Sequence, residues 1–244
     1  LRRGTAGRKG TGRPLLTMRL AILGNSHAAC LMTAVRDVPG VTGHIEPVFF
    51  ASVAQNMGAL RLNRDGVFVP RDETLKQQIT RSSGGVGKID PAAYDAFLVI
   101  GMNYEIKPTS RAFSSAVRQA ALKQSLQDVL HWDIVRRLRE VTDRPIFCGH
   151  QPLRAIEDNR PQGDFLGYDE ILAEIARETE PLSVTLVAQP EETRVDDLYT
   201  KAVFTQGSTK LGNGKLHDEG DRVHMNTDYG AIYLRHLADQ LAVA

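Results

Sequence analysis

The sequence has few cysteines and no long apolar run. Only Cys30 and Cys148 occur among the 244 residues, too few for a disulfide framework or a cysteine-based metal site, so we expect both as buried small side chains. No stretch approaches the ~18 apolar residues that a membrane span requires. The apolar stretch 20–23 is also far shorter than the core of a secretory signal. We therefore expect no membrane span and a cytoplasmic location.

The chain also lacks a strong excess of either charge, since its formal net charge is +1. Residues 1–17 contain five basic residues and no acidic one, so residues 18–244 carry a net charge of −4. A mildly acidic folded part argues against a nucleic-acid-binding surface.

Residues 1–17 are rich in Gly and Arg and offer almost nothing to bury, so we expect a disordered basic tail. Met18 directly precedes the first expected strand, which leaves two interpretations open: residues that are not native to the protein, and a tail for an acidic partner. The remaining residues, 18–244, are enough for one sizeable domain and short for two.

Short apolar runs alternate with longer helical patterns along the chain. We expect strands at 19–24, 47–51, 96–101, 145–149 and 184–187. Helices are expected at 27–36, 113–141 (bent or split near His131-Trp132), 168–179 and 228–241. Apolar strands separated by helices predict an α/β fold, a three-layer α/β/α sandwich around a parallel sheet. The polar segment 58–94 is interpreted as an excursion beside the sheet.

Ligands of such sheets bind beyond the carboxyl ends of the strands. This rule selects three loops, at 25–27, 102–104 and 149–152. In the first, Ser26 lies at a sharp strand-to-helix junction, which exposes its hydroxyl and favours developing negative charge.

A serine nucleophile needs a base. His224 is a candidate, and Asp221, three residues earlier, is close enough to hold one ring nitrogen protonated. At the end of the third strand, the amide of Asn103 is a candidate donor to a tetrahedral oxyanion.

These residues lie in three short motifs, Gly24-Asn25-Ser26-His27, Gly101-Met102-Asn103 and Asp221-x-x-His224. Together they resemble the first, third and fifth sequence blocks of the SGNH/GDSL hydrolase superfamily, in the order of that family. The resemblance spans roughly residues 18–236. The sequence around Asp221–Gly230 is similar to a bacterial subset of the family (members with Gly-Asn-Ser-His), some of which act on acylated sugars.

The resemblance implies a flavodoxin-like, five-stranded parallel sheet of order 2-1-3-4-5 and ester hydrolysis through an acyl-serine intermediate. It also implies an oxyanion hole built from the Ser26 N–H, the Asn103 amide and a glycine N–H. By topology that glycine is Gly58, with Gly84 or Gly85 as the alternative.

Two positions depart from the family pattern. Asn25 stands where the family usually has Asp, and Tyr104 follows Asn103 where Asp is common. His27, Tyr104 and His150 are candidates to line the substrate pocket, because each lies in or beside one of the selected loops.

His217, Asp221 and His224 have spacings of four and three that suit metal ligands, but no third strong ligand is near and Asp221 has a better role beside His224. The segment 83–88 lacks the glycine and the Ser or Thr of a phosphate-binding loop. We therefore expect no metal and no cofactor.

The sequence thus predicts a serine esterase that acts on a small-molecule or glycan ester. Two alternatives stay open, an O-acyltransferase that uses the same three residues and a non-catalytic sugar- or partner-binding module on the same fold. The oligomeric state is not predicted.

Overall fold

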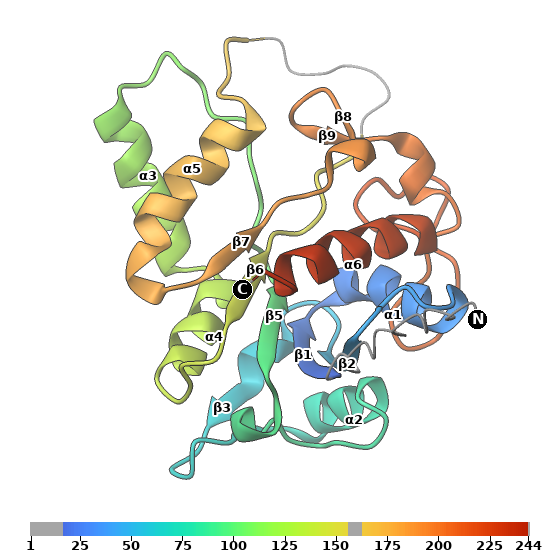
Figure 1. The fold of residues 1–244 in the computed structure, drawn as a ribbon. Helices are drawn as coiled ribbons and strands as arrows, with labels where there is room; N and C mark the ends of the chain where they lie inside the picture. The colour runs from blue at the N-terminus through green and yellow to red at the C-terminus, as the bar shows by residue number, and fades with distance from the viewer. Residues whose placement is uncertain (1–16, 156–162, 244) are drawn as a thin grey trace, which may run out of the picture.

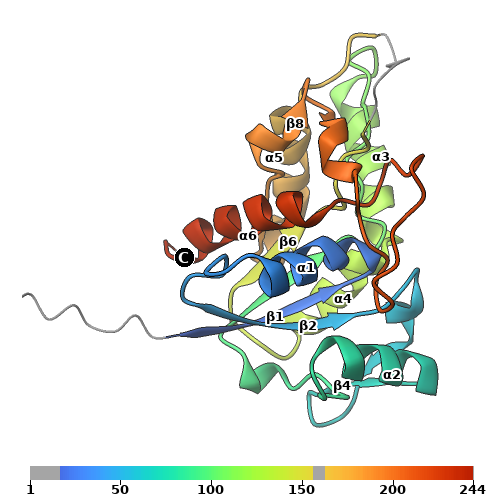
Figure 2. The same ribbon diagram turned by 90° about the vertical axis from the view of Figure 1, so that its right-hand side faces the viewer.

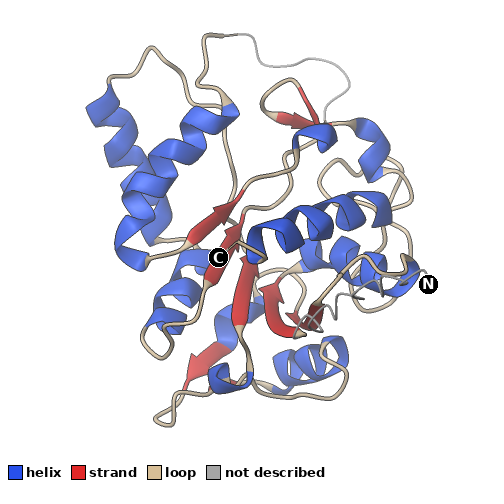
Figure 3. Cartoon of the chain, viewed as in Figure 1, coloured by secondary structure: helices blue, strands red, loops and turns tan. Residues whose placement is uncertain are grey.

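A computed structural model describes residues 17–155 and 163–243 of the chain. The expected tail at 1–17 lies outside the described residues, apart from Thr17. Helices and strands alternate along the chain (Figure 3).

Five parallel strands form the central sheet: β1 (Met18–Gly24), β2 (Ile45–Ala51), β5 (Ala96–Ile100), β6 (Ile146–Gly149) and β7 (Thr185–Val187). Their spatial order is β2-β1-β5-β6-β7, which confirms the predicted order 2-1-3-4-5. The register pairs Gly24 with Ala51 on one side and with Ile100 on the other. The carboxyl ends of β1, β2 and β5 therefore meet at one edge, where the first two of the selected loops begin.

Alternate residues of each strand enter two separate cores. Leu20 and Ile22 of β1 pack with α1 (Ala29–Asp37) and α6 (Thr227–Leu241) on one face. Ala21 and Leu23 pack on the other face, which is covered by α2 (Glu73–Ser82), α4 (Leu130–Arg139) and α5 (Tyr168–Thr179). Figures 1 and 2 show the three layers, with α1 and α6 side by side on one side of the sheet and α2 on the other. The predicted α/β/α sandwich is confirmed.

The helical stretch predicted at 113–141 consists of two helices, α3 (Ser115–Gln127) and α4. The break lies at 128–129, where Val129 is extended, slightly before the predicted position near His131-Trp132. Both cysteines are buried as free thiols, as expected.

The segment 58–94 is more regular than the excursion we predicted. It contains the antiparallel pair β3 (Leu60–Leu62) and β4 (Phe68–Pro70), followed by α2. The α2 helix covers the sheet with only two buried residues, Leu75 and Ile79, so its apolar signal is weak in a polar sequence. Its start is stabilised by Asp72, which accepts a hydrogen bond from the N–H of Leu75 (2.7 Å).

Short elements complete the described chain: η1 (Ser26–Ala28), η2 (Asn56–Ala59), η3 (Pro91–Ala93), η4 (Glu180–Leu182), η5 (Glu191–Thr193), η6 (Ala202–Thr205), and the β8 (Arg194–Val195) and β9 (Tyr199–Thr200) pair. Within the described ranges, no helix is long and apolar enough to cross a membrane.

The crossing of α1 and α6 depends on Gly230. A Cβ atom at this position would lie 2.1 Å from the carbonyl oxygen of Cys30 in α1. The two backbones therefore lie so close together that only glycine fits at position 230.

We expect Gly230→Ala to force α6 away from α1 and to lower the free energy of unfolding by about 1–3 kcal/mol. Urea denaturation measures this loss. Gly220→Ala is the matched control, since a Cβ there meets no atom within 4 Å. Equal unfolding midpoints for the two variants would contradict the assigned role of the α1–α6 contact.

Candidate active site

Ser26 begins the short helix η1 directly after β1, and η1 leads into α1. The side chain of Asn25 caps this turn by accepting a hydrogen bond from the N–H of His27 (3.3 Å). Ser26 is partly exposed between the buried residues Asn25 and His27. The first N–H groups of a helix have no partner within it, so the N–H of Ser26 has no acceptor inside η1.

A chain of hydrogen bonds joins Ser26 to Asp221. The Oγ atom of Ser26 lies 3.0 Å from Nε2 of His224, and Nδ1 of His224 lies 2.9 Å from Oδ2 of Asp221. A carboxylate only accepts hydrogen bonds, so Nδ1 carries the ring proton. Nε2 is then the acceptor, and the Ser26 hydroxyl donates to it.

Asp221 is held as a carboxylate by its neighbours. Partial burial acts to raise its pKa, but the backbone N–H and ring of His224 and the N–H of Val223 outweigh this and lower the pKa to about 2. The two N–H groups donate to Oδ1 at 2.8 and 2.9 Å. The same contacts fix the turn that presents the imidazole.

His224 lies between two other imidazoles. The ring of His217 stacks on it with centroids 3.9 Å apart, and the ring of His27 stacks at 5.1 Å. Burial, with a further contribution from His224, lowers the pKa of His27 to about 3. The same two causes lower the pKa of His217. Both flanking rings are therefore neutral at neutral pH and pack against His224 without adding charge.

His217 also contacts Asp221, with its Nδ1 3.3 Å from Oδ2. His217, Asp221 and His224 bring potential metal-ligand atoms within 4.8 Å of one another. The two rings are nearly parallel, at 9°, so their nitrogen lone pairs do not converge on one point. Oδ2 of Asp221 is already shared by both rings, an arrangement that suits hydrogen bonding better than coordination.

Asn103 lies in an unusual turn after β5. Gly101, Met102 and Asn103 all have positive φ, at 72°, 54° and 66°, a conformation that costs of order 1 kcal/mol or more for each non-glycine residue. Gly101 is required here, because a Cβ would lie 2.4 Å from Oδ1 of Asn25. The turn after β5 and the turn after β1 are thus packed directly against each other, and Asn103 is exposed at this edge.

His131, at the start of α4, stabilises the strained turn. Its backbone N–H donates to the carbonyl oxygen of Met102 (3.3 Å), and its Nδ1 lies 3.2 Å from that of Gly101. Burial lowers the pKa of His131 to about 3, so the ring is neutral and Nδ1–H is the donor. No local pattern in the sequence identifies His131 as the partner of this turn, because the pairing depends on α4 packing against β5.

The glycines proposed for the oxyanion hole already use their N–H groups. The N–H of Gly58 donates to Gln55 (2.8 Å) within the η2 turn. The N–H groups of Gly84 and Gly85 donate to the carbonyl oxygens of α2, at 3.4 and 2.8 Å. In this conformation none of the three offers a free donor, so Ser26 and Asn103 are the candidates that remain.

The three candidates for lining the pocket lie deeper than expected. His27 is buried beneath His224. His150 is buried with both ring nitrogens in contacts of 2.6 Å, one to the carbonyl of Gln151 and one to the hydroxyl of Tyr168. Tyr104 is also buried, but part of its side chain borders a groove beside Asn103.

No protein-family model and no curated protein matches the chain. Several solved structures resemble it, among them the following two. Protein YxiM of Bacillus subtilis is 12% identical, with a TM-score of 0.43 over 93% of this chain and 57% of its own. A gut microbial diltiazem-metabolizing enzyme is 11% identical, with a TM-score of 0.44 over 98% and 50%. The chain thus spans about half the length of these proteins, and likenesses this distant carry no information about activity.

The buried histidine under the turn makes folding sensitive to acid. The pKa of His131 is about 3 in the folded protein, against an ordinary value of 6.5, so its contribution to stability is complete above about pH 6.5 and is lost as the pH falls toward 3. From about pH 7 to pH 5 the loss should be about 2 kcal/mol.

His131→Asn keeps an N–H donor for Gly101 and removes the titration. Between pH 7 and pH 5, the wild type should lose about 2 kcal/mol more of its free energy of unfolding than this variant does. Urea denaturation at both pH values measures the difference. The same pH dependence in the variant and the wild type would show that His131 is protonated in the folded protein.

Proposed function

We propose that the chain is an SGNH-type serine hydrolase that cleaves carboxylic esters, with Ser26 as nucleophile. The observation that carries the proposal is the continuous hydrogen-bonded chain from Ser26 Oγ through His224 to Asp221. The resemblance of the three sequence motifs to the SGNH/GDSL superfamily supports the same assignment.

In the proposed mechanism, Nε2 of His224 takes the hydroxyl proton as Ser26 Oγ attacks the ester carbonyl carbon. The imidazolium that forms is stabilised by the carboxylate of Asp221, which stays ionised. The carbonyl oxygen becomes an oxyanion next to the Ser26 N–H and the Asn103 amide, the donors proposed to stabilise it.

The tetrahedral intermediate collapses when the bond to the leaving oxygen breaks and His224 gives its proton to the departing alcohol. Water then attacks the acyl-serine, with His224 again taking and returning a proton. Attack by a sugar hydroxyl in place of water would make the same site an O-acyltransferase. The resemblance to family members that act on acylated sugars suggests a carbohydrate as the alcohol part of the substrate.

A fluorophosphonate probe tests for an activated serine. We expect one adduct per wild-type chain by intact mass, and none on Ser26→Ala. Ser115→Ala, an exposed serine at the start of α3, is the matched control and should be labelled like the wild type. Absence of any adduct on folded wild-type protein would overturn the nucleophile assignment and favour a binding module.

Loss of the base should remove turnover but leave the fold intact. We expect His224→Ala to lower kcat on an aryl ester by roughly a thousandfold or more, with circular dichroism unchanged. Asp221→Asn should also lower kcat strongly, because an amide donor disfavours the required tautomer of His224. His236→Ala in α6, whose ring lies 3.0 Å from the side-chain amide of Gln240, controls for removing an imidazole. Near-normal kcat in His224→Ala would exclude the proposed base.

A further inference from the structure

A groove of about 440 Å³ opens beside the turn that follows β5. It begins at Asn103 and Tyr104 and runs between α3, α4 and α5. Its walls are mainly apolar. They include the side chains of Val117, Ala121, Leu122, Leu126, Trp132 and Ile171.

The α3 helix forms one wall and is packed only shallowly on the protein. None of its 13 residues is buried, and Val117 is 52% exposed. Helices of this length usually owe their stability to an apolar face packed on the core. In α3, Leu122 and Leu126 are only partly buried against the core, and together with Val117 they border the groove.

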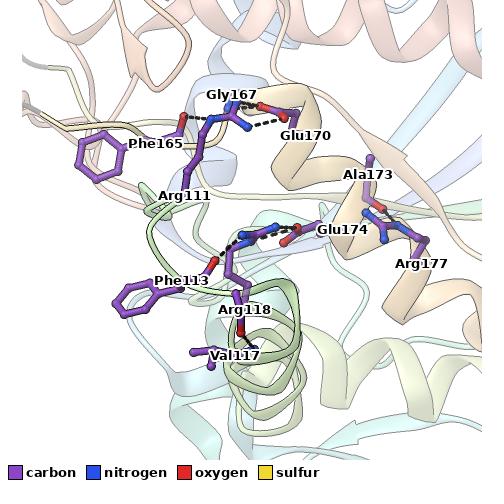
Figure 4. A network of polar contacts seen from close by, with 11 residues as sticks. Arg111, Phe113, Val117, Arg118, Phe165, Gly167, Glu170, Ala173, Glu174 and Arg177 are labelled. Atoms are coloured by element: carbon purple, nitrogen blue, oxygen red, sulfur yellow. Dashed lines mark hydrogen bonds and ion pairs between the residues drawn. The ribbon is translucent and has the colours of Figure 1, made fainter.

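Ion pairs attach α3 and the loop before it to α5. Arg118 of α3 contacts Glu174 at 3.2 Å, and both side chains are largely buried. In the preceding loop, Arg111 pairs with Glu170. Figure 4 shows these two pairs, which involve Glu170 and Glu174 on successive turns of α5. They hold the two helices together while the apolar space between them stays open.

The charges that border the groove are paired with each other. Arg118 and Glu174 form one pair. In the second pair, Nζ of Lys107 lies 3.4 Å from Oε2 of Glu105. The mainly apolar lining and the paired charges together suit an uncharged apolar ligand.

The groove and the candidate active site have Asn103 in common. Asn103 borders the groove, and it follows β5 at the sheet edge where Ser26 follows β1. An ester whose carbonyl oxygen accepts a hydrogen bond from the Asn103 amide therefore lies beside the groove.

We propose that this groove binds the acyl chain of the substrate, so that the Ser26 site acts on esters of medium-chain fatty acids in preference to acetates. The proposal rests on the proposed esterase function. It concerns only the acyl part of the ester and leaves the alcohol part to the other side of the site.

Hydrolysis of p-nitrophenyl acetate, butyrate and octanoate tests the preference. For the wild type, kcat/KM should rise by about fourfold for each methylene that enters the groove. Ala121→Phe, which fills the groove, should lower the ratio of octanoate to acetate activity at least tenfold. Ala120→Phe is the matched control, because Ala120 is the neighbouring α3 residue and does not border the groove.

Binding is measured separately from catalysis, by the fluorescence of Trp132. This residue is the only tryptophan of the chain and borders the groove. Decanamide, an uncharged probe, should give a saturable change in Ser26→Ala and in Ala120→Phe, and acetamide should give none. Ala121→Phe should abolish the decanamide response. Val117→Phe, at a more exposed position, replaces Ala121→Phe if that variant does not fold.

The outcomes separate the two proposals. Saturable decanamide binding without ester hydrolysis or probe labelling would overturn the esterase and the acyl-ester substrate class with it, leaving only an apolar binding site. Ester hydrolysis with no chain-length preference, and equal ratios for Ala121→Phe and Ala120→Phe, would overturn the acyl groove and leave the esterase standing. A wild-type dimer that Ala121→Phe dissociates, with no decanamide binding, would instead make the groove an interface between copies and overturn the proposal.

Discussion

The close contact of α1 with α6 is the constraint on which the rest of the candidate site depends. α1 follows Ser26 after one short turn, and α6 begins three residues after His224. The distance between the two helices therefore sets the distance between hydroxyl and imidazole. Gly230 makes that distance short, since its Cα lies directly against the carbonyl of Cys30. A hydrogen bond between residues 198 positions apart is in this way determined by one backbone crossing.

A second contact joins the ends of two neighbouring strands. Asn25 and Gly101 touch because β1 and β5 are paired in parallel register, and His131 holds the left-handed turn that follows Gly101. Neutral imidazoles recur throughout this region, since burial lowers the pKa values of His27 and His131 to about 3. They supply hydrogen bonds and flat packing surfaces without charge. Asp221 can then be the dominant charge beside His224.

The groove and the candidate active site share one residue, Asn103, and differ in how they are built. The site is held by close backbone contacts and buried hydrogen bonds. The groove is held by ion pairs across its rim, Arg118 with Glu174 in particular, and its apolar wall on α3 is only partly packed against the core. Rigid positioning at the reacting atoms beside an unfilled apolar space is the combination that an enzyme for chain-bearing esters needs.

The sequence by itself determined the five strands and the bounds of α5, because apolar runs are local signals. The strand order and the candidate residues Ser26, Asp221 and His224 came from short motifs and from the family that they resemble. It did not reveal α2, whose burial rests on Leu75 and Ile79 alone. Only the tertiary structure decided that His131 supports the turn that carries Asn103. It also decided which space beside Asn103 stays unfilled. Hydrogen-bond partners and cavities are properties of segments packed together, and no single segment encodes them.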